Sequence, residues 1–148
     1  MSSPSSRRVV LTGVGLISPL GNSRQELWDA LTAGRTGISR FEPAQAAALP
    51  SPFVARAAGF TGEIDNFGTL EGDKKKAIRK GLKVMCRECQ MGVAAAERAL
   101  QDAQLTPATR DPERTGVVFG TDYMLSEPEE FGSGIQACTD DEKKFHFE

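Results

Sequence analysis

The chain has 148 residues, of which 39% are hydrophobic and 26% charged, as expected for a single folded domain with a sizeable core. Its 18 basic and 20 acidic side chains leave a net charge of −2, so neither nucleic acid nor an anionic membrane is expected as a partner. No segment is long and apolar enough to span a bilayer, and the first residues lack the apolar stretch of a secretion signal. We therefore expect a cytoplasmic protein.

The chain begins with elements that are typical of an α/β protein. Residues 1–6 are a polar tail, which we expect to be disordered, and the β-branched run at residues 8–12 (RVVLT) predicts a buried strand. A helix is expected next, because Ser23 followed by Glu26 three residues later is typical of a capping box. Gly34 is suited to end this helix.

The strongest periodic signal lies in the middle of the chain. After a second expected strand at residues 53–60, apolar side chains recur three and four residues apart from Leu82 to Ala103. This spacing places them on one face of a helix of about six turns, which predicts the most deeply packed helix of the fold. The members of this apolar stripe are Leu82, Cys86, Cys89, Val93, Ala96, Leu100 and Ala103. With a third strand expected at residues 115–119 (TGVVF), the order of elements indicates a layered α/β domain.

Two of the three cysteines form a C-x-x-C pattern. Cys86 and Cys89 are not followed by a second ligand pair, so the spacing does not predict a metal site. Because both lie on the apolar stripe, we interpret them as small core residues rather than as a redox pair. We expect no metal and reduced thiols.

The segment after the first expected strand, VVLTGVGLISPLG, begins like a dinucleotide-binding loop. Gly13 and Gly15 follow the strand as G-x-G, but the third glycine position is Ser18. Pro19 stands where a helix would present its first amides to a pyrophosphate. An acidic residue about 20 positions further on, at the end of a second strand, is also missing. We therefore interpret the glycines as part of a tight turn that needs glycine dihedral angles.

Taken together, several segments resemble the β-ketoacyl-ACP synthases, the condensing enzymes of fatty-acid and polyketide synthesis. The opening RRVVLTGVGLISPLGNSRQELWDALTAGRTGISRFE shares with them a basic pair, the pattern TG-x-G-x-x-SP-x-G and the turn AG-x-x-GI. RKGLKVM at 79–85 and AAAERALQDAQL at 94–105 resemble their long central helix, and RTGVVFGT at 114–121 resembles their third strand. The resemblance covers residues 7–121, and residues 122–148 are expected to be an incomplete continuation of the same domain.

This resemblance implies the amino-terminal half of a thiolase-like fold, with layered α-β-α architecture and a mixed sheet, in a protein that is usually a homodimer. The family's reaction is a decarboxylating Claisen condensation that needs no cofactor. A cysteine thiolate takes an acyl group from acyl carrier protein, and two histidines assist the decarboxylation of malonyl-ACP and stabilise the developing negative charge. Intact members are well over twice as long, so we expect a fragment that is inactive alone. The alternative is a non-catalytic module that binds a carrier protein or pairs with a complementary half.

The letters Ala137-Cys138-Thr139 match the family's nucleophile motif, but the context does not. In the family this cysteine follows an apolar strand and opens a helix, whose N-terminus favours the thiolate. Cys138 instead follows FGSGIQ and precedes three acidic residues, which disfavour a thiolate. His146 is a single histidine where two are needed. We therefore expect no catalytic residue within this chain.

Basic residues are concentrated in the segment DKKKAIRKGLKVMCR at 73–87. On a continuous helix, one face would carry Lys76, Arg79, Lys80, Lys83 and Arg87. Acyl carrier proteins are strongly acidic, and condensing enzymes are thought to receive them on basic residues near the start of this helix. The resemblance thus implies a docking site at Arg79, Lys80 and Lys83, since a basic patch steers and orients an acidic partner. The alternative is an ordinary solvated helix face.

Overall fold

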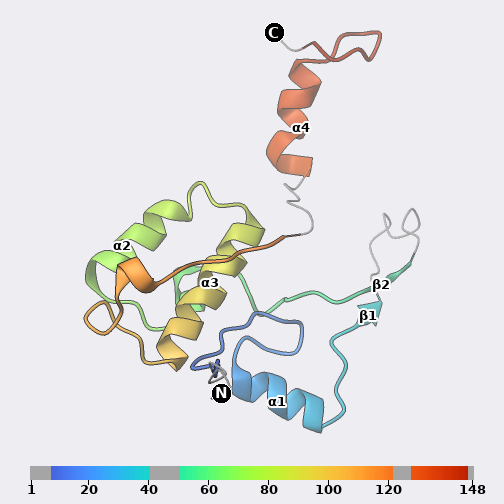
Figure 1. The fold of residues 1–148 in the computed structure, drawn as a ribbon. Helices are drawn as coiled ribbons and strands as arrows, with labels where there is room; N and C mark the ends of the chain where they lie inside the picture. Colours follow the sequence, from blue (N-terminus) through green and yellow to red (C-terminus); the bar gives the residue numbers. More distant parts are fainter. Residues whose placement is uncertain (1–7, 41–50, 122–127, 147–148) are drawn as a thin grey trace, which may run out of the picture.

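The computed structural model describes residues 8–40, 51–121 and 128–146, and of residues 128–131 only the backbone. Within these ranges four helices are joined by long extended segments and two short 3-10 turns (Figure 1). The elements are α1 (Arg24–Thr32), β1 (Ser39–Arg40), β2 (Phe53–Val54), η2 (Ile64–Phe67), α2 (Gly72–Gly81), α3 (Arg87–Asp102), η3 (Pro112–Arg114) and α4 (Pro128–Ala137). Each of these helices falls short of the length and apolar character that a membrane crossing requires.

The capping box predicted for the first helix is confirmed. The Ser23 hydroxyl accepts a hydrogen bond from the Glu26 amide at 3.2 Å, so Ser23 is the N-cap of α1. In return, the Glu26 carboxylate accepts one from the Asn22 amide at 2.7 Å. The bonds from Asn22 and Ser23 lower the pKa of Glu26, because they stabilise its charged form. After α1, Gly34 takes a left-handed conformation with φ of +64° and leads the chain away, as its predicted role requires.

The helix expected from Leu82 to Ala103 is confirmed as α3, but its start is wrong. A turn at residues 82–86 follows the end of α2 at Gly81, and Cys86 is the extended N-cap of α3. Glycine stabilises a helix poorly, and the side-chain amide of Gln90 donates to the Met85 carbonyl at 2.9 Å, which fixes the turn. Apolar spacing of three and four residues continues across such a break, so the pattern did not reveal it.

The core is small and lies where η2 meets α2 and α3. Its fully or nearly buried members are Phe60, Phe67, Ile78 and Ala94. The rings of Phe60 and Phe67 are 6.2 Å apart and inclined at 58°, a favourable aromatic geometry. On α3 the fully buried residue is Ala94, whereas Ala96 of the predicted stripe is exposed. The packed face of α3 is therefore displaced from the face that the sequence indicated.

Two of the three predicted strands are wrong for the described residues. Residues 8–12 and 115–119 run extended but join no sheet, and Val9, Leu11 and Val118 are 92%, 92% and 101% exposed. Of the second predicted strand, only β2 pairs, antiparallel to β1 with Ser39 opposite Val54. A strand needs a neighbouring edge for its amides and carbonyls, and the two apolar runs find none among the described residues. The described architecture is therefore a helical assembly with one small sheet.

Large parts of the chain remain in contact with solvent. Its accessible surface is 12417 Å², whereas a compact monomer of 15.9 kDa would expose about 7,400 Å². The two extended runs at residues 8–12 and 115–119 add apolar surface, because their valines and leucine are uncovered. Figure 1 shows the second of these runs, which follows η3, crossing α3.

Candidate functional site

The three predicted docking residues lie together around the C-terminal end of α2. Arg79 and Lys80 are in its last turn, and Lys83 is in the turn that follows. All three side chains are exposed, and none forms an ion pair with a carboxylate of the described residues. We call this group the basic turn (Arg79, Lys80 and Lys83). The basic turn lies at the C-terminal end of α2, where the helix dipole is negative and positive side chains are favoured.

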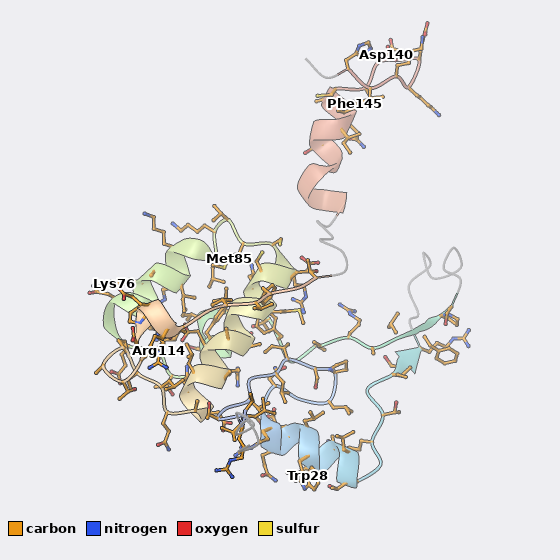
Figure 2. All side chains as sticks on the ribbon, in the orientation of Figure 1. Trp28, Lys76, Met85, Arg114, Asp140 and Phe145 are labelled. Atoms are coloured by element: carbon orange, nitrogen blue, oxygen red, sulfur yellow. The ribbon has the colours of Figure 1, made fainter. Side chains whose placement is uncertain are left out.

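Two of the lysines near the start of α2 form ion pairs within the fold. Lys74 pairs with Glu97 of α3 at 2.5 Å, and Lys76 pairs with Asp73 at 3.2 Å. Lys76 lies on α2 and Met85 in the turn that leads to α3 (Figure 2). Lys75 has no ion pair among the described residues, and the other unpaired cations of this segment, Arg79, Lys80 and Lys83, lie at the C-terminal end of the helix.

Arg87 does not belong to the basic face on which the sequence placed it. Its guanidinium donates to the carbonyl of Phe60 at 2.9 Å and, more weakly, to that of Ala57 at 3.4 Å. It also lies over the Phe60 ring, 5.5 Å from the ring centre. Because α2 ends six residues before it, Arg87 begins a different helix and holds the loop before η2 against α3.

Cys138 lies at the wrong end of a helix for an activated nucleophile. Its amide donates to the carbonyls of Gly134 at 3.1 Å and Ile135 at 3.2 Å, so it immediately follows the C-terminus of α4. The helix dipole is negative at this end. The helix N-terminus that activates such cysteines is thus absent at Cys138.

The single histidine is engaged with a carboxylate in the same turn. Nε2 of His146 is 2.7 Å from Oδ2 of Asp140, and the hydrogen bond from His146 lowers the pKa of that aspartate. The His146 amide also donates to the Cys138 carbonyl at 2.7 Å, which closes the turn that contains Asp140 and Phe145 (Figure 2). Cys138 and His146 thus meet through their backbones, and the imidazole contacts Asp140.

The glycines of the opening loop serve a close approach to a helix, so our interpretation of them as a tight turn is wrong. Neither Gly13 nor Gly15 has a positive φ. A Cβ on Gly13 would lie 2.6 Å from the amide nitrogen of Ala103, and one on Gly15 would lie 2.5 Å from that of Ala99. Both distances are far below van der Waals contact, so residues 13–15 can lie against α3 only without side chains at these two positions.

The amide between those glycines already has an acceptor. The Val14 amide donates to Oδ2 of Asp102 at 2.9 Å, and the same oxygen is 3.4 Å from the guanidinium of Arg24. A carboxylate therefore stands where a dinucleotide loop would present its amide to a phosphate. The sequence carried no signal for this contact, because Val14 and Asp102 are 88 residues apart.

Arg98 of α3 joins two loops and was also missed. Its Nε donates to the Asn66 carbonyl at 2.8 Å and its Nη1 to the Asn22 carbonyl at 2.9 Å. Beside it lies an open cavity of about 220 Å³, which is lined in part by Asn22, Arg24 and Asp102. Arg24 pairs with Asp102, and Arg98 binds the Asn22 carbonyl, whereas the buried Oδ1 of Asn22 has no hydrogen-bond partner among the described residues. We interpret the cavity as a gap within a structural clamp.

Of the two cysteines at the start of α3, which we expected in the core, one is exposed. Cys89 is exposed and Cys86 half-buried, so the core interpretation is wrong for Cys89. Their sulfurs are 3.4 Å apart. Among the described residues, no three histidine, cysteine or acidic side chains gather into a group that could hold a metal ion.

Comparison with known proteins identifies the family. The model of the β-ketoacyl synthase N-terminal domain matches residues 6–145. The chain belongs to the β-ketoacyl synthase family. This finding confirms the resemblance stated from the sequence, and the family's N-terminal domain implies an α/β fold of the thiolase type, which the described helices and small sheet do not contradict.

Relatives in this family come from both polyketide and fatty-acid synthesis. The granaticin polyketide putative β-ketoacyl synthase 1 of Streptomyces violaceoruber is 42% identical over 118 residues, which cover 78% of this chain and 25% of that protein. The actinorhodin polyketide putative β-ketoacyl synthase 1 of Streptomyces coelicolor is 39% identical over 121 residues (78% and 22%). The 3-oxoacyl-[acyl-carrier-protein] synthase 2 of a Synechocystis species is 34% identical over 125 residues (82% and 26%). The chain thus spans about a quarter of the length of these relatives, and no solved structure matches it.

Proposed function

We propose that this chain is the N-terminal part of a β-ketoacyl synthase, an acyltransferase that condenses an acyl thioester with malonyl-ACP. The observation that carries the proposal is the match of the family's N-terminal domain to residues 6–145, with relatives that are named as synthases of both pathways. The reaction is a decarboxylating Claisen condensation in fatty-acid or polyketide synthesis. It needs a cysteine thiolate and paired hydrogen-bond donors for an oxyanion.

The layered thiolase-like architecture is part of this proposal. The apolar runs at residues 8–12 and 115–119 have strand-forming composition and exposed side chains. Gly13 and Gly15, which follow the first run, lie close to α3, and Phe119 of the second run lies close to Gly92 of α3. Such runs suit a sheet that is completed by further strands, with α3 packed on one face. We propose that the remainder of the protein supplies those strands and covers the apolar surface. A homodimer and a cytoplasmic location stay predictions.

We propose that the nucleophile and the two histidines lie outside the described residues. Two observations indicate that Cys138 and His146, in the turn after α4, are not the nucleophile and one of these histidines. Cys138 follows the C-terminus of a helix, and the imidazole of His146 is hydrogen-bonded to Asp140. The chain alone is then expected not to condense acyl and malonyl thioesters. A non-catalytic carrier-binding module would share these features. The two hypotheses differ in whether the whole protein catalyses the condensation.

The basic turn is the proposed docking site for acyl carrier protein. Its three exposed cations have no partner among the described carboxylates and project from one helix end, an arrangement that can steer and orient an acidic protein. Exposed charges are screened over about 10 Å at 0.1 M salt, so we expect weak binding that decreases as salt rises.

The docking proposal is tested by charge reversal in the full-length protein. Lys80→Glu combined with Lys83→Glu should weaken carrier-protein binding roughly tenfold, because each exposed pair contributes up to about 1 kcal/mol and reversal replaces attraction by repulsion. A matched control, Lys143→Glu with Lys144→Glu in the turn after α4, changes the net charge equally and should retain affinity. Binding should be measured by calorimetry at low and high salt. Equal affinity for the parent and the Lys80/Lys83 variant would leave the basic turn as an ordinary solvated surface.

A further inference from the structure

The start of α3 carries two neighbouring thiols that the proposed synthase reaction does not use. Cys86 is the N-cap of α3, and Cys89 lies three residues further on, in its first turn. Residues three apart at a helix start lie on one side, and here the two sulfurs are 3.4 Å apart. Cys89 is exposed and Cys86 half-buried, so a small reagent can reach the pair.

From this geometry we propose that Cys86 and Cys89 form a reversible dithiol–disulfide site. A disulfide needs a sulfur–sulfur bond of about 2.05 Å, so the sulfurs must approach by about 1.4 Å. Rotation of the exposed Cys89 side chain can supply much of this movement. Because Cys86 precedes the regular helix with extended backbone (φ −65°, ψ 165°), its side chain is not confined by a preceding helical turn.

The environment distinguishes the roles of the two sulfurs. The hydrogen bond with Cys86 raises the pKa of the Cys89 thiol, and the negative charge of Glu88 acts in the same direction. The Cys89 thiol therefore keeps its proton, and Cys86 occupies the N-cap position of α3, at the positive end of the helix dipole. Cys86 is accordingly the attacking sulfur and Cys89 the resolving one.

The oxidant is a low-molecular-weight disulfide, such as oxidised glutathione. The Cys86 thiolate attacks one of its sulfurs, and one glutathione thiolate leaves. The Cys89 sulfur loses its proton to solvent and attacks the Cys86 sulfur of this mixed disulfide, which releases the second glutathione thiolate. Two protein thiols are thus oxidised by two electrons to one disulfide, and one glutathione disulfide is reduced to two thiols.

The test uses the full chain with Cys138→Ser, which removes the third thiol and leaves the pair intact. After equilibration with an excess of oxidised over reduced glutathione, free thiols are alkylated and the protein is digested and analysed by mass spectrometry. We expect a peptide linked between Cys86 and Cys89 that has lost two hydrogen atoms, and its return to two alkylated thiols after dithiothreitol. Persistence of two free thiols, or two separate glutathione adducts without a bond between the sulfurs, would overturn the proposal.

Single-cysteine variants in the same background test the assigned roles. Cys89→Ser should retain glutathione on Cys86, because the resolving sulfur is missing, and Cys86→Ser should react several-fold more slowly at Cys89. A second measurement needs no cysteine variant. Phenylarsine oxide condenses with two adjacent thiols with loss of water, so the parent chain should bind it at Cys86 and Cys89 and not at Cys138. Faster glutathione attachment at Cys89 than at Cys86, or arsenical bound elsewhere, would contradict the proposed site.

Discussion

Replacing Gly15 with alanine should separate the opening segment from α3. The added Cβ would lie 2.5 Å from the Ala99 nitrogen and 2.9 Å from the Ala95 carbonyl carbon, where 3.4–4 Å is ordinary contact. Both atoms are helix backbone and cannot move aside by changing rotamer, so the segment must lift by about 1 Å. Such overpacking costs about 1–3 kcal/mol. Lifting also weakens the hydrogen bond from the Val14 amide to the Asp102 carboxylate. A hydrogen bond to a charged group contributes about 1.5–3 kcal/mol to stability.

Because these two costs overlap, we expect the free energy of unfolding to fall by about 2–4 kcal/mol. The measurement is equilibrium urea unfolding in dilute solution, followed by the circular dichroism of the helices, with the slope m compared as well as the midpoint. The matched control is Gly116→Ala, because a Cβ there meets nothing within 4 Å and the residue has no positive φ. It should stay within about 0.5 kcal/mol of the parent. A Gly15→Ala variant that unfolds at the parent's midpoint would refute the close approach to α3.

Three further perturbations test local parts of the account. Ser23→Ala removes the N-cap acceptor of α1 and should cost about 1 kcal/mol of unfolding free energy in the same urea assay. Val93→Asp should cost about 1–3 kcal/mol, since Val93 packs against the core, whereas Ala96→Asp on the exposed side of the same helix should cost far less; equal effects would refute the assigned face. The pKa of Asp140 is lowered in the folded state, so its contact with His146 stabilises the turn above the ordinary aspartate value of about 3.9 and is lost as pH falls through the folded pKa. His146→Ala should raise the Asp140 pKa in an NMR titration, and an unchanged value would exclude the contact.

Local chemistry made the first helix predictable from the sequence. The Ser23 cap and the Glu26 carboxylate act over four residues, so their pattern is visible without knowledge of the fold. The sequence also showed glycine at positions 13 and 15, but it did not show why these positions need glycine. It depends on α3, which begins more than 70 residues later along the chain.

The elements that failed are those whose structure depends on distant partners. A β-branched run such as residues 8–12 indicates strand composition, but a strand forms only when another edge supplies hydrogen bonds, and none of the described residues does so. The break between α2 and α3 escaped detection, because apolar spacing shows which side chains share a helix face and does not show whether the helix is continuous.

The candidate site was predictable in part. Composition and the family resemblance indicated the basic turn, and the structure leaves its three side chains exposed. It also removed Arg87 from that face, because the guanidinium binds the Phe60 carbonyl across 27 residues, a contact that no local pattern encodes. Burial of Cys89 was wrongly expected for a similar reason, since the stripe gave no information on where α3 begins.

We propose above all that this chain belongs to an acyltransferase whose nucleophile is not Cys138. The direct measurement is mass spectrometry of the full-length protein after incubation with an acyl-carrier thioester, with the acylated peptide identified after digestion. We predict an acyl adduct on a cysteine outside residues 8–146, and an unmodified Cys138 in the same sample. An adduct on Cys138, or no acyl adduct at all, would contradict the claim.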